Sequence, residues 1–299
     1  MRIGVDFGGT NIKAAIVNHA AVIRHVSVPT NAGAGPQAVL QALASAVAQL
    51  AAGNLPVGVA IPGEVNDAGV CFKLPNVPGF EQFPLRAELQ SRLGCQVAIE
   101  NDATAAALAE RLFGWGERYR SFLLVTLGTG IGGGLVLDGN LRRGHGGFAG
   151  EIGHVLVDSS PTAWPCGCGR TGCMEAYAGT KGLLRHYASL AGNQSGQGKH
   201  SGDVRAIFES QDPHSQAMMG FLGQALGSGL ASLNNALDLD ALVFTGGVAG
   251  VFDRLEPHIR LALRQRSYSQ PQGEVAMLAS KLGEHAGVIG AAWLPQPGK

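Results

Sequence analysis

The chain has 299 residues, of which 45 are glycine, and its acidic and basic residues cancel to a formal net charge of zero. This length is enough for two lobes, and a neutral chain without a basic run lacks the charge pattern of a nucleic-acid binder. No apolar run reaches the roughly 18–20 residues of a membrane span, and the N-terminus has no signal-peptide pattern. We therefore expect a cytoplasmic enzyme that has neither nucleic acid nor a membrane as its partner.

Short apolar strands alternate with helical segments along the chain, which predicts an α/β fold. Residues 2–5, 12–17 and 22–28 form three successive expected strands, and others are expected at 57–61, 97–99, 121–127, 240–244 and 274–278. Helices are expected at 36–52, 85–93, 103–113, 180–190, 213–237 and 285–294.

Glycine-rich turns follow three of these strands. Their sequences are D-F-G-G-T-N at 6–11, L-G-T-G-I-G-G-G at 127–134 and T-G-G-V at 245–248. Paired glycines let main-chain N–H groups approach phosphate oxygens, and Asp6 could hold a hydrated metal ion that accompanies the phosphates. An ordinary hairpin is the alternative for the first turn. A similar turn about 120 residues later predicts two halves that each begin in this way, with ligand between them.

Asn101 and Asp102 stand where a strand ends and a helix begins. Either side chain is a good helix N-cap, and capping alone would explain the pair. The alternative is that one residue caps while the other projects from the carboxyl end of the sheet, where ligands of open α/β folds bind. A carboxylate in that place could take a proton from a substrate hydroxyl.

A metal-binding pattern occupies residues 150–175. His154 is followed by Cys166, Cys168 and Cys173, and the acids Glu151 and Glu175 flank this set. Three cysteines and a histidine suit a closed, tetrahedral structural zinc site with no position left for water. Free thiols and a catalytic zinc are the alternatives. The metal would fix a loop so that the acids and His154 can face a small polar substrate.

Together these motifs resemble the ROK family of sugar kinases over nearly the whole chain, and its bacterial glucokinase branch in particular. D-F-G-G-T-N-I-K at 6–13 and the turn at 127–134 resemble the family's phosphate motifs, and the turn at 245–248 its adenosine motif. E-N-D-A at 100–103 resembles the catalytic-base motif, and E-I-G-H at 151–154 with the cysteine run resembles the metal and sugar signature.

The resemblance implies an actin-like ATPase (ribonuclease H-like) fold with two α/β lobes, the active site in the cleft between them, and ATP, Mg²⁺, a hexose and structural Zn²⁺ as ligands. Asp102 would be the catalytic base. The hexose would be held by Asp102 and by Gly63, Asn76, Asn101, Glu151, His154 and Glu175. The nucleotide would be held by Asp6, Gly8, Gly9, Thr10, Asn11, Lys13, Gly128, Thr129, Gly130, Gly132, Gly133, Gly134, Gly246 and Gly247.

The resemblance also predicts the domains, the substrate and the assembly. The small lobe would span 1–102, with a C-terminal helix at about 284–299 packing back on it, and the large lobe would span 103–283. Glucose is the expected acceptor, with N-acetylglucosamine, fructose or allose as alternatives. Glu151 makes N-acetylmannosamine a less favoured acceptor. ATP is favoured over polyphosphate as donor, and a homodimer is expected. A non-catalytic sugar sensor and a repressor are the alternatives to a kinase.

Overall fold

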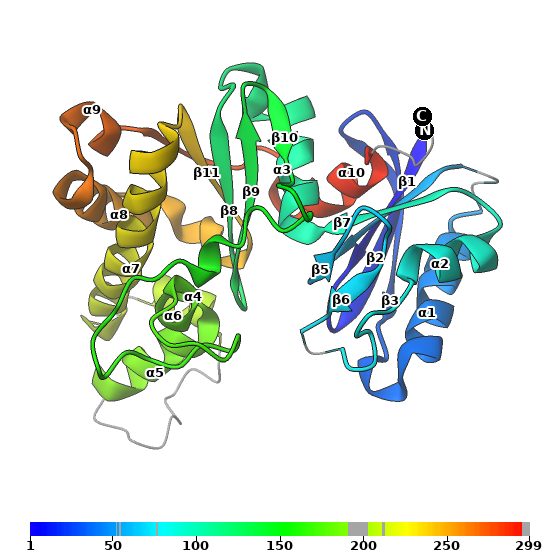
Figure 1. Ribbon diagram of the computed structural model, residues 1–299, viewed down its shortest axis with the longest axis horizontal. Helices are drawn as coiled ribbons and strands as arrows, with labels where there is room; N and C mark the ends of the chain where they lie inside the picture. Colours follow the sequence, from blue (N-terminus) through cyan, green and yellow to red (C-terminus); the bar gives the residue numbers. More distant parts are fainter. Residues whose placement is uncertain (52, 54, 76, 191–202, 211–212, 295–299) are drawn as a thin grey trace. The chain divides into compact units, whose positions relative to one another are not determined.

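A computed structural model describes residues 1–51, 53, 55–75, 77–190, 203–210 and 213–294 (Figure 1). The chain forms two compact units. Unit 1 contains Met1–Ser121, Gly134–Gly150 and Ser280–Lys299, and unit 2 contains Phe122–Gly133 and Glu151–Ala279. The helix at 102–113 belongs to unit 1, whereas the large lobe predicted from the sequence begins at residue 103. The lobe boundaries stay a prediction.

Unit 1 is built on a five-stranded sheet of order β3-β2-β1-β4-β7. β1 (Arg2–Phe7), β2 (Asn11–Asn18) and β3 (Ala21–Pro29) form an antiparallel meander, while β4 (Val57–Ile61) and β7 (Val97–Asn101) run parallel to β1. The crossovers carry α1 (Pro36–Gln49) and α2 (Leu85–Leu93), and a small hairpin, β5 (Glu64–Val65) and β6 (Cys71–Lys73), follows β4. Parallel neighbours need such crossovers. Because β1, β4 and β7 are parallel, their carboxyl ends lie at the same edge of the sheet.

The two faces of this sheet have different covers because successive side chains alternate between faces. On one face, Val5 and Phe7 of β1 pack with Leu40 and Leu43 of α1 in the main core cluster. On the other face, α10 (Ala286–Ala292) contacts β1, β4 and α3 (Asp102–Phe113). Gly4 permits this approach, since a Cβ there would lie 1.9 Å from the carbonyl oxygen of Val288.

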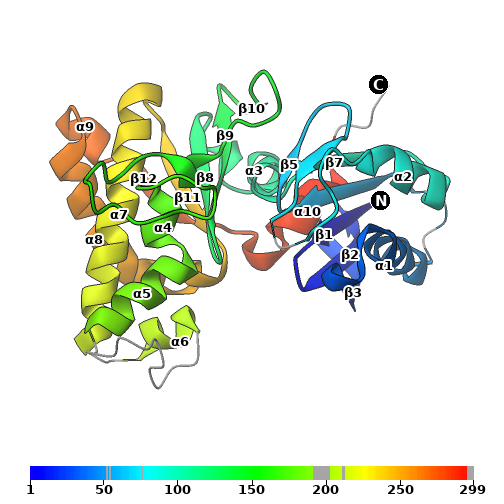
Figure 2. The same cartoon turned by 60° about the horizontal axis from the view of Figure 1, so that its bottom comes forward.

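The second sheet has the order β10-β9-β8-β11-β12. β8 (Phe122–Leu127), β11 (Ala241–Thr245) and β12 (Ala276–Ala279) are parallel, and β9 (Ile131–Leu137) pairs antiparallel with β10 (Asn140–Arg142). Unit 2 adds α4 (Met174–Ala178), α5 (Thr180–Leu190), α6 (Val204–Glu209), α7 (Pro213–Leu237), α8 (Phe252–Arg266) and α9 (Gln270–Gly273). Figure 2 shows α7 and α8 side by side, where Gly223 and Gly227 bring the helices close together.

Short 3₁₀ turns complete the chain: η1 (Ala32–Ala34), η2 (Trp115–Glu117), η3 (Ile152–His154), η4 (Gly247–Val251) and η5 (Gly283–His285). Two sheets of five strands with flanking helices confirm the α/β class. Most expected element boundaries differ from the structure by one to three residues, and three of them are informative. The helix expected to reach residue 52 ends at Gln49, and Ala51 takes a left-handed φ of 50°. The strand expected from 274 starts at Ala276, because α9 occupies the chain up to Gly273. The last helix ends at Ala292, and residues 295–299 lie outside the described part of the chain.

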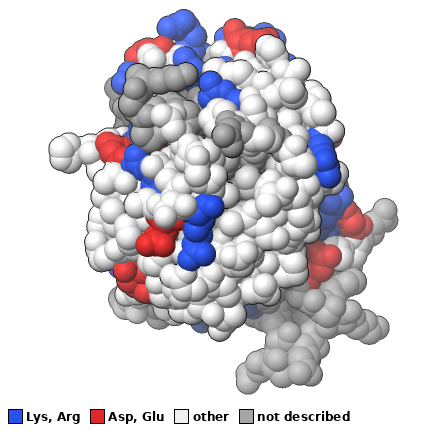
Figure 3. Space-filling view, turned by 90° about the vertical axis from the view of Figure 1, so that its right-hand side faces the viewer, with Lys and Arg blue, Asp and Glu red and all other residues white. Residues whose placement is uncertain are grey.

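The surface shows no concentration of charge on the face drawn in Figure 3. Basic and acidic side chains are scattered there among uncharged residues, and the described atoms of this face form no continuous basic patch. Among the described segments, none of the helices is both long and apolar enough to traverse a membrane.

Candidate active site

The first glycine turn joins β1 to β2 in unit 1. Its ends are tied by the Gly8 N–H, which donates to the Asn11 carbonyl at 3.0 Å. Thr30 lies fully buried beneath the turn; its hydroxyl donates to the Gly8 carbonyl at 2.6 Å and its N–H to the Thr10 carbonyl at 2.9 Å. A Cβ on Gly9 would meet no atom within 4 Å. The outer side of the turn is therefore open, as a main-chain phosphate cradle requires.

Asp6 and Lys13 face each other across β1 and β2 as register partners. Burial raises the pKa of Asp6, and the neighbouring Lys13 ammonium opposes that rise. Lys13 also pairs with Glu284 at 3.4 Å. A carboxylate drawn out of water beside a phosphate cradle suits a divalent cation that travels with the phosphates. Asp6 thus fits the role of an Mg²⁺ anchor.

The carboxyl ends of β4 and β7 bring Gly63, Asn101 and Asp102 together. The Asn101 side chain is the N-cap of α3, since its Oδ1 accepts from the N–H groups of Ala103 at 3.0 Å and Thr104 at 3.1 Å. Its Nδ2 donates to the Gly63 carbonyl at 3.3 Å. Asn101 therefore supplies the cap, and Asp102 begins the helix with its carboxylate half-buried and Oδ1 2.8 Å from the Ala103 nitrogen. Asn76 lies outside the described residues.

An ion-pair network lies directly behind this edge. Glu100 is 3% exposed; one carboxylate oxygen accepts from the Asn101 N–H at 2.9 Å and the other contacts the Arg143 guanidinium. Arg143 also pairs with Asp67. Burial raises the pKa of Glu100 to about 7, and the hydrogen bond from Asn101 opposes the rise. The network ties Arg143, just after β10, to the end of β7 immediately before Asp102.

The second glycine turn joins β8 to β9, and its glycines have different surroundings. Gly128 has open space on its Cβ side, and Thr129 is exposed. Gly132 donates to the Thr126 hydroxyl at 3.0 Å within the hairpin, and Gly133 lies in β9. Gly134 instead packs against α3, where a Cβ would lie 2.4 Å from that of Ala107. The open part of the turn is therefore its tip, around residues 128 and 129.

The third glycine turn lies beside the second in unit 2. β11 runs parallel to β8, with Thr245 opposite Thr126, so both strands end at the same edge. Gly246 has a φ of 96°, and a Cβ there would lie 2.4 Å from the Leu127 carbonyl oxygen. Gly247 faces open space and starts η4. This close approach of two turns suits one extended ligand that spans both of them.

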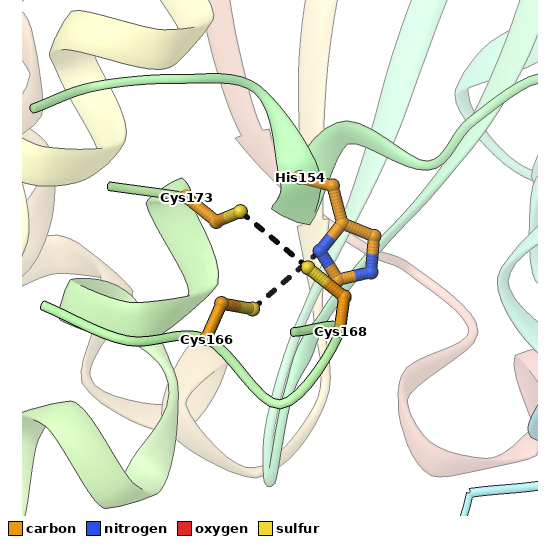
Figure 4. Close-up of side chains that lie close together, drawn as sticks. All are labelled: His154, Cys166, Cys168 and Cys173. Atoms are coloured by element: carbon orange, nitrogen blue, oxygen red, sulfur yellow. Dashed lines mark hydrogen bonds between the residues drawn. The ribbon is translucent and has the colours of Figure 1, made fainter. Parts of the chain in front are cut away.

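The metal-binding pattern folds into one cluster. His154 ends η3, and the cysteines follow in the loop that leads into α4 (Figure 4). The ligand atoms of His154, Cys166, Cys168 and Cys173 all lie within 4.8 Å of one another. The Cys168 and Cys173 sulfurs are 3.7 Å apart, as are the Cys166 sulfur and the His154 Nδ1. Tetrahedral zinc with Zn–S bonds of about 2.3 Å places two sulfurs about 3.8 Å apart, so the cluster is consistent with structural zinc.

Two acids border this cluster. With Nδ1 of His154 turned toward the cysteines, its Nε2 lies 3.8 Å from the carboxylate of Glu151, which is about half exposed. Glu175 lies on α4, where one oxygen is 3.9 Å from the Cys166 sulfur and the other accepts the Ile131 N–H at 3.0 Å. The sequence indicated both acids. It did not indicate Thr30 or Arg143, whose partners are distant in the chain and follow no local spacing.

Comparison with known proteins identifies the family and several relatives of this chain. Residues 2–297 match the model of the ROK family. A glucokinase of Halalkalibacterium halodurans is 33% identical, with 98% of this chain and 94% of that protein covered. An N-acetylmannosamine kinase of Escherichia fergusonii is also 33% identical, with 98% of both chains covered.

A solved structure shares both the sequence similarity and the fold. It is that of a ROK family glucokinase from Streptomyces griseus in complex with glucose and AMPPNP. The two sequences are 32% identical, and the match covers 97% of this chain and 97% of that chain, with a TM-score of 0.83. This agreement confirms the expected actin-like ATPase fold.

Proposed function

The chain belongs to the ROK family and is a sugar kinase, and we propose that it transfers the γ-phosphate of ATP to the 6-hydroxyl of a hexose, with glucose as the preferred acceptor. The observation that carries this proposal is the carboxyl edge of the unit 1 sheet. There Asp102 opens α3 after β7, and the first glycine turn follows β1, with only β4 between these two parallel strands.

In the proposed reaction, Asp102 accepts the proton of the attacking hydroxyl. Phosphoryl transfer needs little covalent chemistry from a protein, so positioning and charge stabilisation dominate. The N-terminus of α3 and the hydrogen bond from Ala103 favour the carboxylate form. Asp102 is therefore a weak base that receives the proton late, once the bond to phosphorus is largely formed.

The remaining groups hold the reactants. The three glycine turns offer N–H groups to the phosphates and space for the nucleoside. Mg²⁺ would be held through Asp6, and it neutralises charge on the phosphates when bound. Zn²⁺ would be held by His154, Cys166, Cys168 and Cys173, and it fixes their loop when bound. By the family resemblance, hexose hydroxyls would then be bound by Asn101, Glu151, His154 and Glu175, and Gly63 and Asn76 are expected to contribute to the same site.

The choice of acceptor rests on the relatives. Two of the named relatives are glucokinases, and one of these was solved with glucose and an ATP analogue. The N-acetylmannosamine kinase is equally identical to this chain, so that sugar joins N-acetylglucosamine, fructose and allose as an alternative. A homodimer and a cytoplasmic location stay predictions from the family resemblance.

A coupled assay of ADP release tests the proposal. We expect the highest kcat/KM for glucose among these five sugars, with ATP preferred over polyphosphate. Asp102→Asn should bind glucose and nucleotide as the wild type does while losing nearly all turnover. Asp138→Asn, in an exposed turn outside the site, is the matched control. Full activity of Asp102→Asn would refute the assignment of the base, and sugar binding without turnover of any hexose would favour a sensor.

A further inference from the structure

The second glycine turn is held from beneath by the junction of α4 and α5. The Thr180 hydroxyl donates to the Gly128 carbonyl at 2.9 Å, and the Thr180 N–H donates to the Thr129 carbonyl at 3.2 Å. At the next peptide group of the turn, between Gly130 and Ile131, the Ile131 N–H donates to Glu175 Oε2 at 3.0 Å. Three successive peptide groups of the turn are thus fixed by two side chains and one main-chain group of a single short segment.

The fit at this junction leaves no room for side chains. A Cβ on Gly130 would lie 2.3 Å from Glu175 Oε2, and one on Gly179 would lie 3.1 Å from the Thr129 carbonyl oxygen. On a second side, a Cβ on Gly153 of η3 would lie 2.3 Å from the Ile131 carbonyl oxygen. The turn is therefore in close contact with both η3 and the α4–α5 junction.

The same two elements carry the metal ligands. His154 is the last residue of η3, and Cys173 immediately precedes α4. The Glu175 carboxylate connects the two sites directly, since its other oxygen lies 3.9 Å from the Cys166 sulfur. A metal ion that joins His154 to the cysteines would consequently fasten together the two elements that hold the turn.

These contacts also set the direction of the turn's N–H groups. In a trans peptide the carbonyl and the N–H point in opposite directions. Because the carbonyls of Gly128 and Thr129 point at Thr180, the N–H groups of Thr129 and Gly130 point away from α5. Main-chain N–H groups fixed in this way form a preorganised anion site.

We propose that Glu175 and Thr180 are positioning residues for the phosphate donor, and that the metal cluster controls nucleotide affinity through them in addition to hexose affinity. The inference rests on the proposed function, in which this turn holds nucleotide phosphates. Glu175 then has two tasks, one toward the hexose and one toward the turn, and Thr180 has only the second.

Thr180→Val separates these tasks because it removes the hydroxyl while keeping the branched shape. The readouts are the Kd of AMPPNP with Mg²⁺ and the Kd of glucose, each titrated alone by calorimetry, and the zinc content of the same samples. We expect AMPPNP to bind about five-fold more weakly, as loss of one hydrogen bond implies, with glucose affinity and zinc content unchanged. Thr180→Ser retains the hydroxyl and should restore the AMPPNP affinity.

Glu175 and the metal provide the second arm. Glu175→Gln keeps an oxygen that can accept the Ile131 N–H, so it should weaken glucose binding and leave AMPPNP binding near that of the wild type. Glu175→Ala and removal of zinc by a chelator should weaken both ligands, and added zinc should restore both in the chelated wild type. A Thr180→Val protein that binds AMPPNP normally, with chelation affecting glucose alone, would overturn the inference and leave the kinase proposal standing. A wild type that binds no nucleotide would overturn both.

Discussion

Replacing Gly58 by alanine should displace α10 from the sheet of unit 1. Gly58 is the second residue of β4, beside its register partner Gly4 on β1. A Cβ on Gly58 would lie 1.7 Å from the carbonyl oxygen of Ala291 in α10. Ordinary contact begins at 3.4 Å, so the helix would have to move by about 1.7 Å. The obstacle is main chain on both sides, and no rotamer change relieves it.

The size of the effect follows from overpacking. An extra methyl group in a well-packed interior typically costs 1–3 kcal/mol, and a clash with a helix carbonyl belongs at the upper end, about 3 kcal/mol. In a protein body of about 150–250 residues, each kcal/mol lowers the Tm by roughly 2–4 °C. We therefore expect the Tm of the unit 1 transition to fall by about 6–12 °C in scanning calorimetry.

Gly33→Ala is the matched control. A Cβ at Gly33 would meet no atom within 4 Å, and the residue lies in η1 of the same unit. Its Tm should stay within about 2 °C of the wild type, because surface changes are usually worth less than about 0.5 kcal/mol. If Gly58→Ala melted like Gly33→Ala, α10 could not lie where the structure places it.

Two further predictions concern the metal cluster and the buried acid. Cys168→Ser should lose the single zinc ion expected per chain and bind glucose more weakly, whereas Cys95→Ser, outside the cluster, should keep the zinc ion. Elemental analysis measures the zinc content, and a wild-type protein without zinc would refute the assignment of a zinc site. Burial raises the pKa of Glu100 from 4.5 to about 7, so the folded state binds this proton more tightly and loses stability as pH rises between these values; the contact with Arg143 favours the carboxylate and reduces the loss. Glu100→Gln should therefore melt with a flatter pH dependence than the wild type between pH 5 and 7, and parallel curves would contradict this.

Local patterns in the sequence predicted much of the fold. The apolar run at 57–61 and the capping pair Asn101-Asp102 specify a strand and a helix start through short-range chemistry, and the structure has both, with Asn101 as the cap. The end of the first helix could not be predicted, because it depends on Ala51 adopting a left-handed conformation that alanine rarely takes.

The candidate site was predictable only in part. The spacing of the histidine and the cysteines predicted the cluster because all four ligands lie close together in the chain, between His154 and Cys173. The partners of Glu175 and Thr180 in the second glycine turn could not be predicted, since they lie 44 and 52 residues away along the chain and meet these side chains only after the sheet has formed. Gly134 shows the opposite case: it belongs to a glycine-rich motif, yet its lack of a side chain serves the packing of α3.

The place of α10 in unit 1 affects how the chain can fold as it is made. β1, β4 and β7 are complete by Asn101, but the helix that covers one face of their sheet begins at Ala286. At about 5–20 residues per second, a ribosome needs roughly 10–40 s to make the intervening segment. During that time the glycine-lined face of the nascent sheet lacks its native cover. Emergence of α10 from the ribosome, and not completion of the sheet, is therefore the event that lets this half of the protein reach its final stability.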